Sequence, residues 1–282
     1  MNKFGINLWN WCAGLSDECE GKPTRAKEIG FGAVELPMTV SCVSERLKDE
    51  ILSTGLEVTL CAAMGPGRDI SNEDSEIVRN TKKYITECLK TGEKLGATLF
   101  CGPLYTGGGK RHFLSDDEKK REWERGVEGV KEMAHIAGEC GMKLALEPLN
   151  RYRTSVCNLA SQVIDMIRDV DMKNVGLHYD TYHACLEEKD LLLSLEDALR
   201  SGTVIHFHAC AQNRGAPGQG IIPWDSVMDL LVRYGYMDHI TMETFAPHGL
   251  DSSYVDVHEA PDELAAIGLD YLKGYFRRRG LN

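Results

Sequence analysis

The chain has 282 residues, of which 43% are hydrophobic and 27% charged, a balance typical of a globular protein with a sizeable core. Its net charge of −11 argues against a nucleic-acid partner, because phosphates are bound mainly through Lys and Arg. No apolar run approaches the roughly 20 residues of a membrane helix, and the N-terminus lacks a signal segment, so we expect a cytoplasmic protein. Its cysteines include no CxxC pair, and we expect them to stay reduced.

Short β-rich segments alternate with longer amphipathic ones along the whole chain. The expected strands cover residues 4–9, 32–36, 56–64 and 97–104, followed by four that end on or near Glu147, Asp180, His208 and Glu243. The expected helices cover residues 23–29, 43–53, 72–95, 115–140, 158–170, 191–200, 224–234 and 261–279. Eight such units predict a (β/α)₈ TIM barrel that forms a single domain over residues 1–282. An open doubly wound sheet is the alternative, but no GxGxxG follows the first strand.

The last four strands each end on a side chain that can bind a metal ion. Glu147, Asp180, His208 and Glu243 occupy these positions, and His206 lies two residues before His208, deeper along the same face of its strand. In a parallel barrel the carboxyl ends of all strands share one rim, where active sites lie. Three carboxylates and one imidazole suit Mn²⁺, Mg²⁺ or Co²⁺ better than a structural Zn²⁺, which prefers sulfur. We therefore predict a divalent metal site at this rim.

Four spaced motifs carry a resemblance to a known family. They are LEPLNRY, DTYH(x)₃EE, HFH(x)₅RG(x)PGQGIIPW and TMETF, in this order from residue 146 to residue 245. The chain thereby resembles the D-tagatose/D-psicose (allulose) 3-epimerases, which belong to the xylose-isomerase-like barrels. The opening FGINLW and the later segment GFGAVEL are also similar to that group.

The resemblance implies a metal-dependent isomerase that interconverts ketoses at C3 through a metal-bound cis-enediolate. It places the metal ligands on Glu147, Asp180, His208 and Glu243, with Glu147 and Glu243 also acting as the catalytic acid and base. It places substrate contacts on His183 and Arg214. The implied ion is Mn²⁺ first, with Co²⁺ or Mg²⁺ as alternatives, and the implied assembly is a homodimer or homotetramer. The expected partner is a small sugar, and we expect neither a nucleic acid nor a membrane as a partner.

One position departs from the family pattern. Six residues after the first ligand the family has a Glu, whereas this chain has Arg153. An Arg at a substrate-binding position pairs with carboxylates and phosphates, which leads to the hypothesis that the substrate carries an anion. The alternative is that Arg153 points away from the site and pairs with a surface acid.

The same residues are compatible with other functions. The same chemistry would serve an aldose–ketose isomerase of the hydroxypyruvate or inosose type, or metal-dependent cleavage of a keto-glycoside. A DNA-repair endonuclease of this fold is disfavoured by the acidic charge. A non-catalytic sugar-binding barrel is disfavoured because both glutamates are present. Aromatic residues at strand ends (Trp9, Trp11, Tyr105, Trp224 and Phe245) are candidates for the walls of a sugar pocket.

Overall fold

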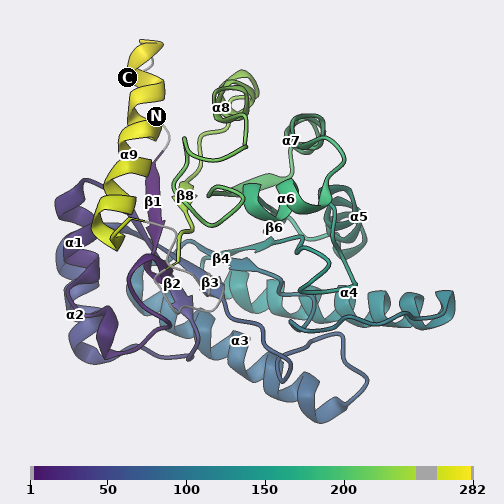
Figure 1. Ribbon diagram of the computed structural model, residues 1–282. Coiled ribbons are helices and arrows are strands. Elements are labelled where there is room, and N and C mark those ends of the chain that lie inside the picture. The colour runs from purple at the N-terminus through teal and green to yellow at the C-terminus, as the bar shows by residue number, and fades with distance from the viewer. Residues whose placement is uncertain (1–2, 246–258, 281–282) are drawn as a thin grey trace.

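The computed structural model describes residues 3–245 and 259–280 and shows a closed barrel of eight parallel strands in the order β1 to β8 (Figure 1). The strands are β1 (Phe4–Asn7), β2 (Ala33–Met38), β3 (Glu57–Ala62), β4 (Leu99–Gly102), β5 (Lys143–Leu146), β6 (Val175–Asp180), β7 (Val204–Ala209) and β8 (Ile240–Met242). The predicted TIM barrel is therefore confirmed, because β8 pairs with β1 and leaves no open edge.

Helices surround the barrel, as Figure 1 shows. They are α1 (Lys22–Ile29), α2 (Glu45–Thr54), α3 (Ser75–Leu95), α4 (Asp116–Glu139), α5 (Ala160–Val170), α6 (Thr181–Glu187), α7 (Leu191–Arg200), α8 (Trp224–Arg233) and α9 (Pro261–Arg278), with short 3₁₀ turns at Leu8–Asn10 and Asp17–Cys19. Within the described ranges none of these helices has the length and apolar composition needed to cross a membrane.

Two local differences from the predicted elements have clear causes. The first strand ends at Asn7 rather than at residue 9, because the Asn7 side chain accepts the backbone N–H of Trp9 at 3.0 Å and starts a 3₁₀ turn. Helix α6 was not predicted at all. It begins directly after Asp180, whose Oδ1 accepts the backbone N–H groups of Tyr182 (2.6 Å) and His183 (3.3 Å) as an N-cap.

The register of the last strands sets the height of the side chains at the barrel mouth. Asp180 on β6 pairs directly with His208 on β7, and His208 pairs with Thr241 on β8. Glu243 follows Thr241 by two residues and so lies on the same face of its strand. The register therefore brings the carboxyl ends of β6, β7 and β8 to nearly one level.

A buried ion cluster anchors the loop after β4. The Lys110 ammonium lies 2.7 Å from Asp69 and 2.6 Å from Glu122, and both carboxylates are almost fully buried. Burial opposes ionisation of Asp69, but the hydrogen bond and charge of Lys110 outweigh it and hold the pKa of Asp69 below its ordinary value. Lys110, which ends the GGGK sequence, therefore has two carboxylate partners.

We expect Lys110→Met to destabilise the protein by about 3 kcal/mol, because it leaves two buried carboxylates without a cation. Thermal denaturation would record this as a fall in Tm of about 6 °C or more. The control is Lys119→Met, since Lys119 pairs with Asp116 only on the exposed surface and its loss costs less than about 0.5 kcal/mol. Because the pKa of Asp69 is lowered, its ionised carboxylate contributes to the stability of the fold above pH ~4. This contribution is lost as the pH falls further. Equal Tm values for the two variants at neutral pH would contradict the role of the cluster.

Candidate metal and sugar site

Four buried side chains meet where strands β5 to β8 end. Glu147 follows β5, Asp180 ends β6, His208 lies in β7 and Glu243 follows β8. One ligand atom from each of the four lies within 4.8 Å of the others, and every one of these residues is at most 5% exposed. The structure thus brings together the four residues that the sequence predicted as metal ligands.

Glu35 on β2 holds the imidazole of His208 from below. Its Oε1 lies 2.6 Å from Nε2 of His208, and it also accepts hydrogen bonds from Asn7 (2.9 Å) and Thr59 (2.9 Å). The other ring nitrogen, Nδ1, lies 3.3 Å from Oε2 of Glu243 and is buried without a hydrogen-bond partner. A buried nitrogen that faces carboxylates and lacks a partner has the position expected of a metal ligand.

Glu35 was not predicted as a site residue. The signal available was weak, because it consisted of one Glu near the end of a strand, in the GAVEL segment. Its partner His208 is 173 residues away in the chain, and only closure of the barrel joins them. His206 also reaches Glu35, with Nε2 2.8 Å from Oε2, which explains why the first His of the HFH motif lies below the site.

We expect Glu35→Gln to weaken divalent metal binding by about 10- to 100-fold, the usual effect of losing the carboxylate behind a ligating histidine. Titration against a competing chelator would measure the affinity directly, without reference to turnover. Glu57→Gln is the matched control, because Glu57 pairs with His239 at 2.8 Å at the start of β3, the opposite end of the barrel. An unchanged affinity in Glu35→Gln, or an equal loss in both variants, would argue against this role.

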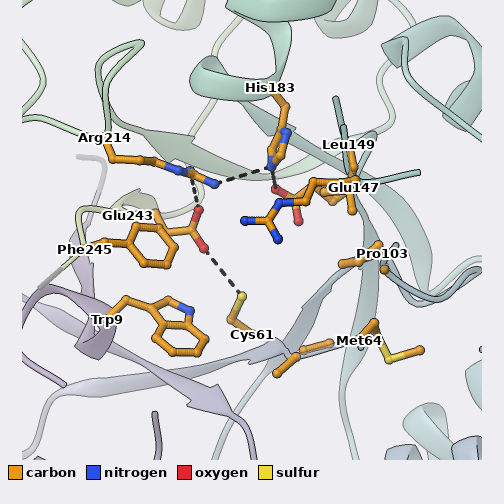
Figure 2. A pocket seen from close by; sticks show the side chains of 14 residues that line it. Trp9, Cys61, Met64, Pro103, Glu147, Leu149, His183, Arg214, Glu243 and Phe245 are labelled. Atoms are coloured by element: carbon orange, nitrogen blue, oxygen red, sulfur yellow. Dashed lines mark hydrogen bonds and ion pairs between the residues drawn. The ribbon is translucent and has the colours of Figure 1, made fainter. Parts of the chain in front are cut away.

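Arg214 lies over the carboxylates from the loop after β7. Its Nη1 is 2.7 Å from Glu243 and 3.1 Å from Asp180, and its guanidinium stacks on the ring of Tyr182 at 3.8 Å. The backbone at Arg214 has φ 63°, a left-handed conformation that costs about 1 kcal/mol or more for a residue with a side chain. This strained turn places the guanidinium at the pocket, as Figure 2 shows.

His183, from the first turn of α6, is the second polar group in the pocket wall. Its Nδ1 accepts the backbone N–H of Asn150 at 2.9 Å, so we assign the ring proton to Nε2. That nitrogen lies 3.8 Å from Oε1 of Glu147. Because the Asp180 cap fixes the start of α6, the candidate ligand also positions this donor.

The two glutamates have opposite electrostatic surroundings. Burial and the charges of Glu243 and Asp180 raise the pKa of Glu147 well above its ordinary value. Burial also acts on Glu243, but His208 and Arg214 outweigh it and lower the pKa of Glu243 to about 2. The two carboxyl groups therefore differ in proton affinity when no metal ion is bound.

A pocket of about 100 Å³ opens above these groups. Trp9 and Phe245 form one wall and stack with ring centroids 5.5 Å apart, while Glu147 and Glu243 approach the opening from opposite sides (Figure 2). Of the five aromatic residues considered as wall candidates, these two line the pocket. The indole N–H of Trp11 bonds to Asp262, that of Trp224 to the carbonyl of Gln219, and the Tyr105 hydroxyl to the carbonyl of Glu147.

The donor set fits a hard divalent cation. One ligand atom from each of the three carboxylates and from the imidazole lies within 4.8 Å of the others, and the Nδ1 of His208 has no hydrogen-bond partner among the described residues. Oxygen-rich sets with one nitrogen suit Mn²⁺, Mg²⁺ and related ions. The site is therefore a buried group of residues able to hold one divalent metal ion.

Fold and site together define a TIM barrel with a candidate metal centre at the carboxyl-terminal mouth of its strands. The chain belongs to the xylose isomerase-like TIM barrel family, whose model matches residues 23–275. It is 36% identical over 256 residues to the D-psicose 3-epimerase of Ruminiclostridium cellulolyticum, covering 88% of this chain and 85% of that protein. It is 28% identical over 250 residues to the ketose 3-epimerase of Arthrobacter globiformis, covering 87% and 81%.

A solved structure supports the same relationship. The D-psicose 3-epimerase of Clostridium cellulolyticum H10, determined with D-tagatose, superimposes with a TM-score of 0.83 at 27% identity and covers 97% of this chain and 99% of that one. The resemblance to ketose 3-epimerases predicted from the four motifs is thus confirmed.

Proposed function

We propose that this protein is a divalent-metal-dependent ketose 3-epimerase. The observation that carries the proposal is that Glu147 and Glu243 approach one pocket from opposite sides. One carboxylate oxygen of each lies within 4.8 Å of the other and of the ligand atoms of the remaining two residues. Epimerisation at a carbon next to a ketone requires a proton to leave one face and return on the other. Two carboxylates that flank the bound sugar meet this requirement, and the relatives named as ketose 3-epimerases support it.

The remaining pocket residues bind and orient the sugar. The Nε2–H of His183 and the guanidinium of Arg214 donate hydrogen bonds toward the oxygens near C1 to C3, while Trp9 and Phe245 pack against its apolar face. When bound to Glu147, Asp180, His208 and Glu243, a divalent cation would supply Lewis-acid stabilisation of the negative charge that develops on the ketone oxygen. Mn²⁺ is the expected ion, with Co²⁺ and Mg²⁺ as alternatives. The configuration at C3 decides which glutamate accepts the proton first.

We further propose that the protein works in the cytoplasm as a homodimer or homotetramer. The ten cysteines, all within the described residues, form no disulfide, which agrees with a reducing compartment. Size-exclusion chromatography with light scattering tests the assembly, and a monomer at micromolar concentration would contradict it.

The test of the function is deuterium exchange from solvent into a panel of ketoses after loading with Mn²⁺. Label at C3, with formation of the C3 epimer, is the expected result. Label at C1 with formation of an aldose would instead identify an aldose–ketose isomerase. Absence of label from every ketose tested would overturn the assignment.

A further inference from the structure

Below the four candidate ligands at the mouth, the barrel interior holds a second group of metal-binding side chains. Cys101 on β4, His178 on β6 and His206 on β7 are fully buried. One potential ligand atom from each of these three, and from His208, lies within 4.8 Å of the others. The proposed epimerase chemistry uses none of the three residues, which we call the interior cluster.

The strand register places the interior cluster one layer below the mouth. His178 lies two residues before Asp180 in β6, and His206 lies two before His208 in β7. Each histidine is therefore deeper on the inward face of its strand. His178 and His206 pair directly between β6 and β7, with ring centroids 4.9 Å apart. Layers inside barrels of this kind are dominated by Val, Ile and Leu, so two imidazoles and a thiol are an unusual filling.

The imidazoles of the interior cluster have unsatisfied nitrogens. Both ring nitrogens of His178 and the Nδ1 of His206 are buried without a hydrogen-bond partner among the described residues. The Nδ1 of His178 lies 3.7 Å from Glu147, which is too far for a hydrogen bond. A neutral imidazole carries one N–H donor and one lone pair, and burying either without a partner costs stability. A cation bound between the two rings would take up one lone pair from each.

The neighbouring groups suit a soft divalent cation. The Sγ of Cys101 lies 3.5 Å from Oε2 of Glu35, and the Nε2 of His206 lies 2.8 Å from the same oxygen. On binding an ion Cys101 would lose its proton to solvent, so that its thiolate and the Glu35 carboxylate balance two positive charges. One sulfur and two imidazoles are donors that Zn²⁺ prefers, whereas the oxygen-rich mouth suits a harder ion.

The interior cluster has a suitable size and a route of entry. A tetrahedral Zn²⁺ holds sulfur and nitrogen ligands roughly 3.3–3.6 Å apart, so the ligand atoms need to approach one another by at most about 1.5 Å. Cys61 pairs with Cys101 between β3 and β4 and also lines the sugar pocket, where Figure 2 shows it linked to Glu243. An ion in the pocket therefore meets Cys61 first and reaches Cys101 on the next strand.

We propose that the interior cluster is a second metal site, which binds one Zn²⁺ through Cys101, His178 and His206 below the ion at the mouth. The bound Zn²⁺ links β4, β6 and β7 inside the barrel and gives each imidazole a partner. This site goes beyond the proposed epimerase function and does not depend on it.

The experiment uses the full chain with excess Mn²⁺ to fill the mouth and one equivalent of Zn²⁺. X-ray absorption at the zinc edge is expected to show one sulfur at about 2.3 Å, a ligand absent from the four residues at the mouth. Metal analysis after gel filtration should find Mn²⁺ and Zn²⁺ bound together, and competition with a chromophoric chelator gives the Zn²⁺ affinity. We expect Cys101→Ala to lose the sulfur signal and to bind Zn²⁺ at least about 100-fold more weakly, since losing only the group behind a ligand costs about 10- to 100-fold.

Cys210→Ala is the matched control. Cys210 is also fully buried, but its Sγ lies 3.8 Å from Asp180 at the mouth, outside the interior cluster. This variant should keep both the sulfur signal and the Zn²⁺ affinity. His178→Leu, which places a typical barrel residue in the layer, is a second variant and should also weaken Zn²⁺ binding. Should Cys101→Ala fail to fold, the wild-type spectrum and His178→Leu still decide the question.

Three results would overturn the second metal site. The first is a zinc spectrum with oxygen and nitrogen ligands alone, which would favour buried water as the partner of the interior nitrogens. The second is Zn²⁺ that displaces Mn²⁺ instead of binding beside it. The third is a sulfur signal that Cys210→Ala removes and Cys101→Ala retains, because the ion would then lie at the mouth. None of these results bears on the epimerase assignment, which C3 exchange in the Mn²⁺-loaded protein tests separately.

Discussion

Replacing either glutamate of the pair, Glu147→Gln or Glu243→Gln, is expected to lower kcat for epimerisation by about 10²- to 10⁴-fold, the contribution of a positioned acid or base. Each substitution keeps the size of the side chain and one oxygen, but removes the group that exchanges a proton with C3. Epimer formation under saturating ketose and metal would be measured for both variants. Thermal melts and metal titration of each variant separate lost chemistry from lost folding or lost metal.

The two variants should also differ from one another in an informative way. With one carboxylate left, only the epimer whose C3 proton faces it can still exchange with solvent deuterium, and no inverted product should form. Glu147→Gln and Glu243→Gln are therefore expected to label opposite epimers. Glu128→Gln, on the exposed face of α4, is the control and should behave as the wild type. Full epimerisation by either site variant with its metal bound would refute a two-glutamate mechanism.

Removal of the metal is the second change with a large expected effect. One oxygen from each of the three carboxylates at the mouth lies within 4.8 Å of the others and of a ring nitrogen of His208, so without the metal ion their mutual repulsion in a buried space is offset only in part, by Arg214 beside Asp180 and Glu243. We expect chelation to abolish turnover. We also expect metal at 1,000 times its Kd to stabilise the fold by about 4 kcal/mol, which corresponds to a rise in Tm of about 8 °C or more.

The measurement is a thermal melt of stripped protein with increasing Mn²⁺, Co²⁺ or Mg²⁺. His208→Ala should lose most of the metal-dependent rise, because it removes the single nitrogen ligand. His112→Ala, on an exposed loop, should retain it. A Tm that is insensitive to all three ions, with turnover unaffected by chelation, would show that the four residues serve another purpose.

The order of strands and helices was predictable because each element carries its own local signal. Buried strands appear as short apolar runs, and helices show a 3.6-residue period with recognisable ends, such as the capping box formed by Ser115 and Glu118 at the start of α4. Helix α6 escaped prediction because it is short and begins directly after Asp180, a residue that serves both as its N-cap and as a candidate metal ligand.

The four candidate ligands were predictable for a different reason. Parallel strands that alternate with helices end on one rim, so residues at consecutive strand ends are neighbours whatever their separation in sequence. Glu147, Asp180, His208 and Glu243 follow from this rule once the barrel is assumed. Their types and order also carried the resemblance to ketose 3-epimerases.

Only the tertiary structure decided which groups support and surround that centre. Glu35 meets His208 because closure of the barrel places β2 and β7 on either side of β1 and β8, and no local pattern encodes a contact of this kind. Arg153 likewise lines both the sugar pocket and a larger pocket of about 560 Å³ beside it, because the loops after β3, β4 and β5 pack together there. Local sequence patterns determine where strands and helices form, whereas contacts across the barrel depend on its closure, which brings residues more than a hundred positions apart within hydrogen-bonding distance.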